Sequence, residues 1–248
     1  MKNIKVRTKL TIIVALVLVL VASESFISIQ NMNQLKNKAL DTMDTSSRQN
    51  YDDSIKEQVG VVISLLSEIN NEYKAGRYSL DEAKKIAADE IRQMRYGNGG
   101  YFWVDQSDGK NIVLLGNSTE GTNRMNTKDA EGYQMIKEII RVAVQDGGGY
   151  TDYVFPKEGE TEPSPKRSYS EYFKPFDWVV GTGNYTDYID TAIAQQDEEF
   201  TSYASSKAIS LILCSVCMLI VVAILVALIA IDITKSLRKI KEQFEVIA

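Results

Sequence analysis

The sequence of 248 residues contains no histidine, two cysteines and four prolines. The missing histidine excludes Ser-His-Asp and Cys-His catalysis, the common zinc sites, and histidine acid–base chemistry near neutral pH. Because Cys214 and Cys217 are the two cysteines, the rest of the chain forms neither a disulfide framework nor a thiolate metal site. We therefore expect no catalytic group, no metal and no cofactor. An apolar content of 44% with few prolines also excludes a disordered or collagen-like chain.

The net charge of −5 is unevenly distributed. Residues 1–9 carry four basic side chains and no acidic one, and residues 232–248 carry four basic and three acidic ones. Residues 10–231 therefore carry a net charge of −10. An acidic middle between two short basic ends argues against a nucleic-acid partner and indicates a membrane topology instead.

Two apolar segments predict membrane helices. Ala208–Ile231 is a run of 24 residues without a charge, enough to cross about 30 Å of hydrocarbon at about 1.5 Å per residue. A buried helix in a soluble protein seldom has so long a run. Leu10–Ala22 is shorter and follows a basic start, so it fits either a cleaved signal peptide or an anchor. Because apolar residues continue to Ile29, we predict an uncleaved anchor, with membrane helices over residues 10–29 and 207–231.

The basic ends predict the orientation of the chain. Lysine and arginine close to a membrane span stay in the cytoplasm. This rule places residues 1–9 and 232–248 inside and residues 30–206 outside. Cys214 and Cys217 then lie in hydrocarbon, where thiolates are disfavoured, so we expect them to pack rather than to do redox chemistry.

The segment between the spans begins with helical patterns. A long helix is expected from Ser23 to about Ala75, ended by Gly76. One apolar stripe with spacings of three and four residues runs along it: Tyr51, Ile55, Val59, Val62, Leu66, Ile69 and Tyr73. Ser79-Leu80-Asp81-Glu82 is a capping box that predicts the start of a second helix. Its inward side chains are expected to be Ala83, Ile86, Ile91 and Met94.

Strand patterns follow, rich in aromatic and β-branched residues and bounded by turns. The predicted strands cover residues 101–105, 111–115, 150–155, 166–172 and 178–182, with one helix over residues 136–143 between the second and the third. From Tyr185 the chain becomes helical again and continues into the second span. This order is typical of an α+β domain with an antiparallel sheet.

Three blocks of this segment resemble the single Cache domain, an extracellular PAS-like sensor. The blocks are Gly99–Asp105 with Asp108-Gly109, then Pro165–Tyr169, then Phe176–Tyr185. They stand in the family's order, within its frame of two membrane helices, and the resemblance covers residues 30–206. It implies a PAS-like antiparallel sheet with a long N-terminal helix, outside a bacterial cell membrane. It also implies a small pocket, which in this family often takes short organic acids.

The C-terminal residues add a second resemblance. Residues 232–248 are similar to the start of a HAMP linker, which follows the second membrane helix of chemoreceptors and sensor kinases. Ser236 stands where such linkers usually have proline. A coiled-coil seam, which needs a partner helix and so predicts a homodimer, is formed by Ile233, Leu237, Ile240, Phe244 and Ile247. We expect either a fragment truncated within this linker or a protein that signals through partners.

One departure from the family pattern concerns the ligand. Many single Cache domains carry a His-Pro pair at the end of the second strand, and Leu115-Gly116 stand at about that place here. If the family's histidine contacts the ligand, that contact is missing from this chain.

The candidate ligand-binding residues come from these blocks. Strand alternation puts Tyr101, Trp103 and Asp105 on one face, where phenol and indole donors can orient a carboxylate. Lys166 would supply the positive charge that an anionic ligand needs in a low-dielectric site. Asp105 would instead serve an amine or another cationic ligand. Further candidates, which the core or the solvated surface explains equally well, are Arg95, Arg124, Tyr169, Trp178 and Tyr185.

These features predict a ligand-sensing receptor, with a short carboxylate favoured and an amine or amino acid as alternatives. A chemotaxis receptor is the favoured output, ahead of a histidine kinase or a cyclic-dinucleotide enzyme, each working through cytoplasmic partners.

A membrane-anchored binding or accessory protein without its own output domain is the second class. An exported enzyme is the third, since Asp105 and Asp108 could form an acid–base pair. No nucleophile–base pair accompanies them, so we predict that the protein is not an enzyme.

Overall fold

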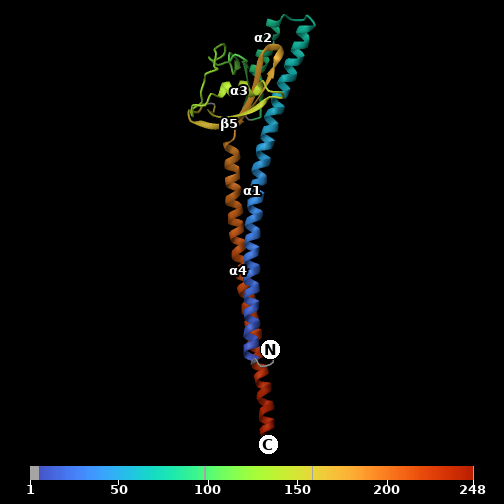
Figure 1. The fold of residues 1–248 in the computed structure, drawn as a ribbon, viewed down its shortest axis with the longest axis vertical. Helices are drawn as coiled ribbons and strands as arrows, with labels where there is room; N and C mark the ends of the chain where they lie inside the picture. The colour runs from blue at the N-terminus through green and yellow to red at the C-terminus, as the bar shows by residue number, and fades with distance from the viewer. Residues whose placement is uncertain (1–5, 98, 158, 248) are drawn as a thin grey trace. The chain divides into compact units, whose positions relative to one another are not determined.

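The structure, a computed structural model, describes residues 6–97, 99–157 and 159–247 (Figure 1). It divides into two units, one of residues 43–193 and one of the helical segments on either side of it in the sequence. Of the basic N-terminal residues, Lys2 and Lys5 lie outside the described part of the chain. The side chains that would form most of the predicted coiled-coil seam, at residue 237 and from residue 240 onward, also lie outside it.

The unit of residues 43–193 is built on a six-stranded antiparallel sheet in the order β1-β2-β6-β5-β4, with β3 also paired to β2. The strands are β1 (Arg95–Tyr96), β2 (Gly100–Gln106), β3 (Asn111–Leu114), β4 (Gly149–Pro156), β5 (Pro163–Phe173) and β6 (Trp178–Tyr185). A 3₁₀ turn, η1 (Lys174–Phe176), links β5 to β6. The predicted antiparallel α+β fold is confirmed. The short strand β1 was not predicted, because two residues are too few to show alternation.

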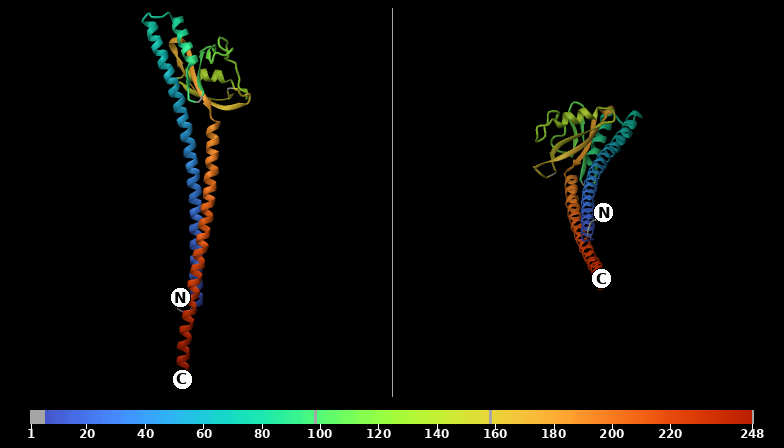
Figure 2. Two further views of the ribbon diagram at one scale, coloured as in Figure 1. Left: turned by 180° about the vertical axis from the view of Figure 1, so that it is seen from behind. Right: turned by 60° about the horizontal axis from the view of Figure 1, so that its bottom comes forward.

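Two helices, α1 (Val6–Lys74) and α2 (Leu80–Gln93), cover one face of this sheet (Figures 1 and 2). The predicted stripe of α1 is confirmed: Tyr51, Ile55, Val59, Val62, Leu66 and Ile69 are buried, and Tyr73 packs at the edge of the same core. Ser79 and Glu82 form the predicted capping box of α2. Each fully buried aliphatic side chain of this kind contributes about 1.5–3 kcal/mol of hydrophobic stabilisation.

A third helix, α3 (Met135–Ala143), covers the opposite face of the sheet. Its apolar side chains pack against Trp103 on β2 and Val179 on β6. Successive residues of a strand point to opposite faces. Phe102 and Val104 accordingly belong to the core under α1 and α2, and Trp103 belongs to the core under α3.

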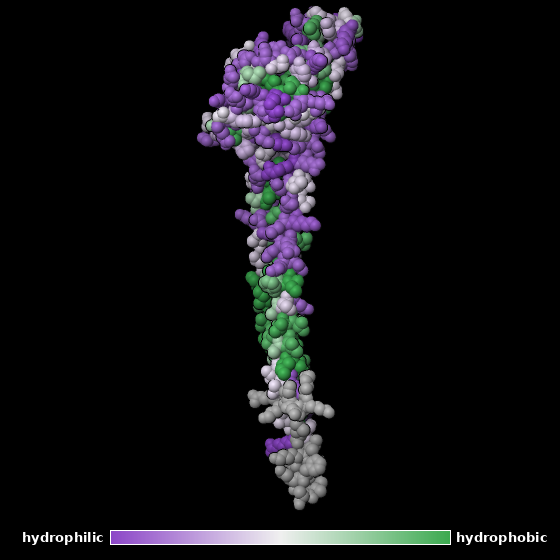
Figure 3. Space-filling model, viewed as in Figure 1, coloured by the Kyte–Doolittle hydropathy of each residue, from purple (hydrophilic) through white to green (hydrophobic). Residues whose placement is uncertain are grey.

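The other unit consists of the N-terminal part of α1, up to residue 42, and of α4 (Asp187–Ile247) from residue 194 onward. Both helices contain stretches long and apolar enough to cross a membrane. The two segments contact each other through Ser25 and Ser215, whose Oγ atoms are 3.2 Å apart, and through an ion pair of 2.8 Å between Lys36 and Asp197. Their large apolar side chains point outward and form the band of hydrophobic surface in Figure 3.

Candidate functional site

Small residues on β5 and β6 leave space on the face of the sheet that α3 covers. Gly181 stands between Trp103 on β2 and Ser170 on β5, its two neighbours across the strands. A Cβ atom added at Gly181 would lie 2.5 Å from Trp103 Cε2 and 2.6 Å from Ser170 Oγ. Glycine at this position therefore allows the indole of Trp103 to lie across β6.

Lys166 on β5 is the central charged side chain of this face. It is 2% exposed, and its Nζ donates a hydrogen bond of 2.9 Å to the hydroxyl of Tyr101. Four aromatic rings surround the ammonium, with centres at 4.7 Å (Tyr101), 5.1 Å (Tyr185), 5.3 Å (Phe155) and 5.7 Å (Trp103). The negative faces of such rings attract a cation, but they do not neutralise it.

The charge of Lys166 is uncompensated. Among the residues that the structure describes, no carboxylate lies within ion-pair distance of Lys166 Nζ. Burial disfavours the charged form, and the nearby guanidinium of Arg124 adds repulsion, so together they lower the pKa of Lys166 to about 7. Lysine is rarely buried without a partner, which makes this residue the strongest candidate for a ligand contact.

Arg124, in the loop between β3 and α3, is by contrast fully paired. Its Nε and Nη2 donate to the two oxygens of Asp105 at 2.7 and 2.6 Å, a bidentate geometry. Asp105 is fully buried and also accepts a hydrogen bond of 3.0 Å from Asn111 Nδ2. The pair closes one side of the site while contributing no net charge.

A small, partly open cavity lies between the sheet and α3. It offers about 20 Å³ to the centre of a water-sized sphere, which is room for about one water molecule. Its lining combines aromatic, aliphatic and two cationic side chains: Tyr101, Trp103, Leu114, Arg124, Met135, Ile136, Ile139, Tyr153, Phe155 and Lys166. An organic acid is larger than this space, so binding of one here would require the surrounding side chains to move apart.

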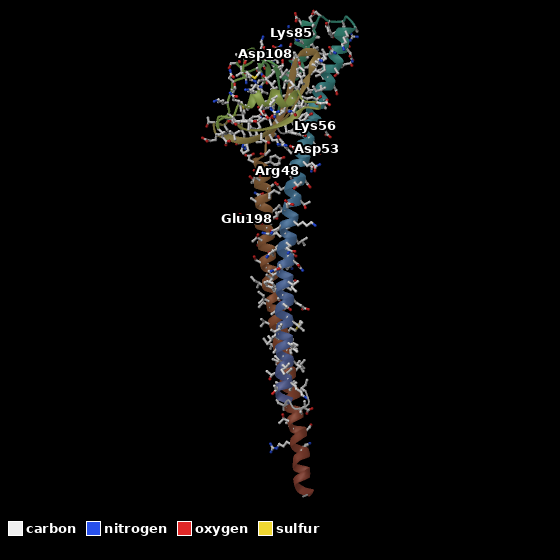
Figure 4. The ribbon with its side chains drawn as sticks, viewed as in Figure 1. Arg48, Asp53, Lys56, Lys85, Asp108 and Glu198 are labelled. Carbon is white, nitrogen blue, oxygen red and sulfur yellow. The ribbon has the colours of Figure 1, made fainter. Side chains whose placement is uncertain are left out.

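Of the residues expected from the sequence, Tyr101, Trp103 and Lys166 meet in this cluster, and Tyr185 joins them from β6. Asp105 points to the same side of the sheet but is held by Arg124. Asp108, which is labelled in Figure 4, lies exposed in the turn after β2 and accepts a hydrogen bond from the Lys110 amide.

Three expected residues lie elsewhere. Tyr169 and Trp178 belong to the core under α1 and α2, on the opposite face of the sheet, because they are one residue out of phase with the site-facing positions of β5 and β6. Lys56 of α1, labelled in Figure 4, lies 5.9 Å from the ring centre of Tyr169 on that side. Arg95 is exposed and donates to the carbonyls of Arg92 and Met94.

Sequence reasoning missed Tyr153 and Phe155, which line the cavity from β4. Alternation along residues 150–155 places the two on one face, but nothing in the sequence says which face meets the ligand. Arg124 lies in a loop without periodicity, so its pairing with Asp105 was also not predictable from spacing.

Comparisons with known proteins agree with this fold. A family model described as "Single Cache domain 2" matches residues 47–199. Over 123 residues the chain is 32% identical to the methyl-accepting chemotaxis protein McpP of Pseudomonas putida, covering 49% of this chain and 23% of that protein. Over 177 residues it is 34% identical to the sensor histidine kinase MctS of Rhizobium johnstonii, covering 71% of this chain and 37% of the kinase. The chain thus spans less than half the length of each relative.

Two solved structures have the same fold. One is described as the periplasmic sensor domain of a chemotaxis protein, with 30% identity and a TM-score of 0.53 over 57% of this chain and 96% of that one. The other is a Cache chemosensory domain whose description concerns carboxylic acid recognition. It is 27% identical, with a TM-score of 0.54, and the match covers 57% of this chain and 97% of that domain.

Proposed function

The chain belongs to the single Cache domain 2 family, and from this premise we propose that it senses a short carboxylate outside the cell through the cluster around Lys166. The proposal is supported by one observation above all, namely that Lys166 is a buried lysine without a carboxylate partner among the described residues. A ligand carboxylate would provide the missing negative charge, and the hydroxyl of Tyr101 would lie beside it.

The charges of the cavity favour an acid over an amine. Both oxygens of Asp105 already accept hydrogen bonds from Arg124, so the carboxylate that could have held an amine is occupied. The small volume and the aromatic walls favour a ligand with a short alkyl or acyl part.

The proposal for the whole chain is a receptor module of the cell membrane. Helices α1 and α4 each hold a stretch that can cross the bilayer, so the ligand domain would lie outside and the segment after residue 231 inside. The signal would be a shift between two arrangements of these helices, in a homodimer, passed to a HAMP-like linker. The relatives make a chemotaxis receptor the first candidate for the output and a sensor kinase the second.

The test is thermal unfolding of the full chain in detergent micelles against acetate, propionate, lactate, alanine and ethylamine. A ligand present at about 100 times its Kd stabilises the folded state by about 2.7 kcal/mol. We expect stabilisation by at least one of the acids and none by ethylamine.

Two variants locate the effect. Lys166→Met removes the charge with little change in length, and we expect it to abolish the stabilisation by acids. Lys128→Met removes an exposed lysine from the loop that carries Arg124, and the effect should persist. Stabilisation by ethylamine, or by an acid equally in wild type and Lys166→Met, would contradict the proposed site.

A further inference from the structure

We infer that the site takes up a proton together with its carboxylate ligand, so that the affinity of the sensor depends on pH near neutrality. This inference rests on the proposed function and concerns the protonation of Lys166 in the empty and the occupied site.

The surroundings of Lys166 are unfavourable for an ammonium group in the empty site. The side chain is 2% exposed, and the hydroxyl of Tyr101 is the acceptor that its Nζ reaches. Transfer of an isolated charge out of water is costly, and a buried lysine reduces this cost by releasing its proton. The lowered pKa of Lys166, about 7, agrees with this geometry.

No element packed around Lys166 offers a compensating charge within the described residues. β2 contributes Tyr101 and Trp103, and β6 contributes Tyr185. From β4 come Tyr153 and Phe155, and α3 adds apolar side chains to the same cavity. The groups that face Lys166 from these elements are therefore phenols and apolar rings.

Arg124, Asp129 and Asp152, three ionised groups nearby, have other partners. Arg124 is a second cation, and its own charge is balanced by Asp105. An open pocket of about 540 Å³, which Lys166 also lines, contains Asp129, Glu131 and Asp152. The carboxylate of Asp129 accepts hydrogen bonds from the backbone amides of Tyr133 and Val154. Asp152 forms an ion pair with Arg167.

The proton balance follows from these contacts. In the empty site above neutral pH, Lys166 is an amine and its proton is in the solvent. An arriving carboxylate places an opposite charge at hydrogen-bond distance, which favours the ammonium form. One proton therefore returns from the solvent for each carboxylate bound, and no covalent bond is formed or broken. Below about pH 7, Lys166 is already charged in the empty site and no proton is taken up.

The test is isothermal titration of the full chain in detergent with acetate and with propionate at pH 8, in phosphate and in Tris buffer. Because the two buffers release protons with different heats, the difference in observed enthalpy counts the protons taken up. We expect about 0.9 proton per ligand at pH 8 for a pKa of about 7, and an affinity that falls toward tenfold per pH unit above neutrality.

The Lys166→Arg variant keeps a positive charge in the site but removes its titration, because a guanidinium stays protonated throughout this pH range. It should bind acid without proton uptake and with an affinity independent of pH between 6.5 and 8.5. Lys128→Met should behave as wild type.

Each result decides a different point. Binding that needs Lys166 but has the same enthalpy in both buffers would overturn this inference and leave the proposed function intact. Absence of binding by both acids at millimolar concentration, at pH 6.5 as well as at pH 8, would overturn both.

Discussion

At the scale of single residues, the proposed site depends on two positions. Lys166 is buried without a counter-ion among the described residues, and Gly181 has no side chain that would collide with Trp103. Burial without a counter-ion makes the charged form of Lys166 unfavourable, and under the proposed function a bound anion would offset that cost. Gly181 is present because the indole of Trp103 occupies the position where a Cβ atom would stand.

Replacement of Gly181 by alanine tests this packing. Its Cβ would come within 2.6 Å of both Trp103 and Ser170, so we expect a displaced indole, a loss of stability of about 1–3 kcal/mol and weakened binding of short acids. Thermal unfolding and titration with propionate measure the two effects.

Gly60→Ala is the matched control. Gly60 lies inside α1 with nothing within 4 Å of its added Cβ, so alanine there should stabilise the helix by up to about 1 kcal/mol and leave binding unchanged. Equal effects of the two substitutions would argue against a specific role of Gly181.

At the scale of elements, the turn after β3 is held by one carboxylate side chain. Leu115 and Gly116 both have positive φ angles, of 58° and 74°. The carboxylate of Glu120 holds this turn by accepting hydrogen bonds of 2.6 and 2.8 Å from the backbone amides of Leu114 and Gly116. It also forms an ion pair of 3.0 Å with Arg92 of α2. One side chain thus links β3, its turn and α2.

The pKa of Glu120 gives a testable pH dependence. Burial alone would raise this pKa, but the two amides and Arg92 outweigh burial and lower it. A carboxyl group whose pKa is lower in the folded protein than in the unfolded chain stabilises the fold at pH values above its unfolded pKa, which is about 4.5 for Glu120. This stabilisation is lost as the pH falls through the pKa of the folded state. Glu120→Ala should therefore cost about 1–3 kcal/mol at pH 7 and progressively less below pH 4.5, as measured by thermal unfolding.

Glu131→Ala, at an exposed position in the loop before α3, is the control and should change stability by less than about 0.5 kcal/mol. A cost for Glu120→Ala that stays constant down to pH 3 would show that the charge does not hold the turn.

The elements themselves were largely predictable from the sequence. The stripe from Tyr51 to Ile69, the capping box at Ser79 and the alternation of Tyr101 and Trp103 are local patterns, and local patterns are what helices and strands impose. Alternation along β5 already puts Tyr169, three residues from Lys166, on the opposite face, whereas the face of Trp178 relative to Lys166 depends on strand register across the sheet. The partner of Arg124 depends on tertiary contacts that no spacing encodes.

At the scale of the whole molecule, two apolar helical stretches and a small sensor domain occur in one chain. Tyr51 of α1 contacts the backbone of Arg167 and Asn184, the residues next to Lys166 and Tyr185 on β5 and β6. These hydrogen bonds connect α1 to the two strands that carry Lys166 and Tyr185. We propose that occupancy of the site acts on α1 through this connection.

The most direct test of a carboxylate site at Lys166 uses the two tryptophans of the chain, Trp103 and Trp178, which lie on opposite faces of the sheet. In a Trp178→Phe variant of the full chain, the remaining emission comes from Trp103. We expect a saturable change in this emission on titration with the stabilising acid, and we expect the change to be lost in Lys166→Met. An acid that stabilises the protein but leaves the emission of Trp103 unchanged binds elsewhere, and that result would contradict the site.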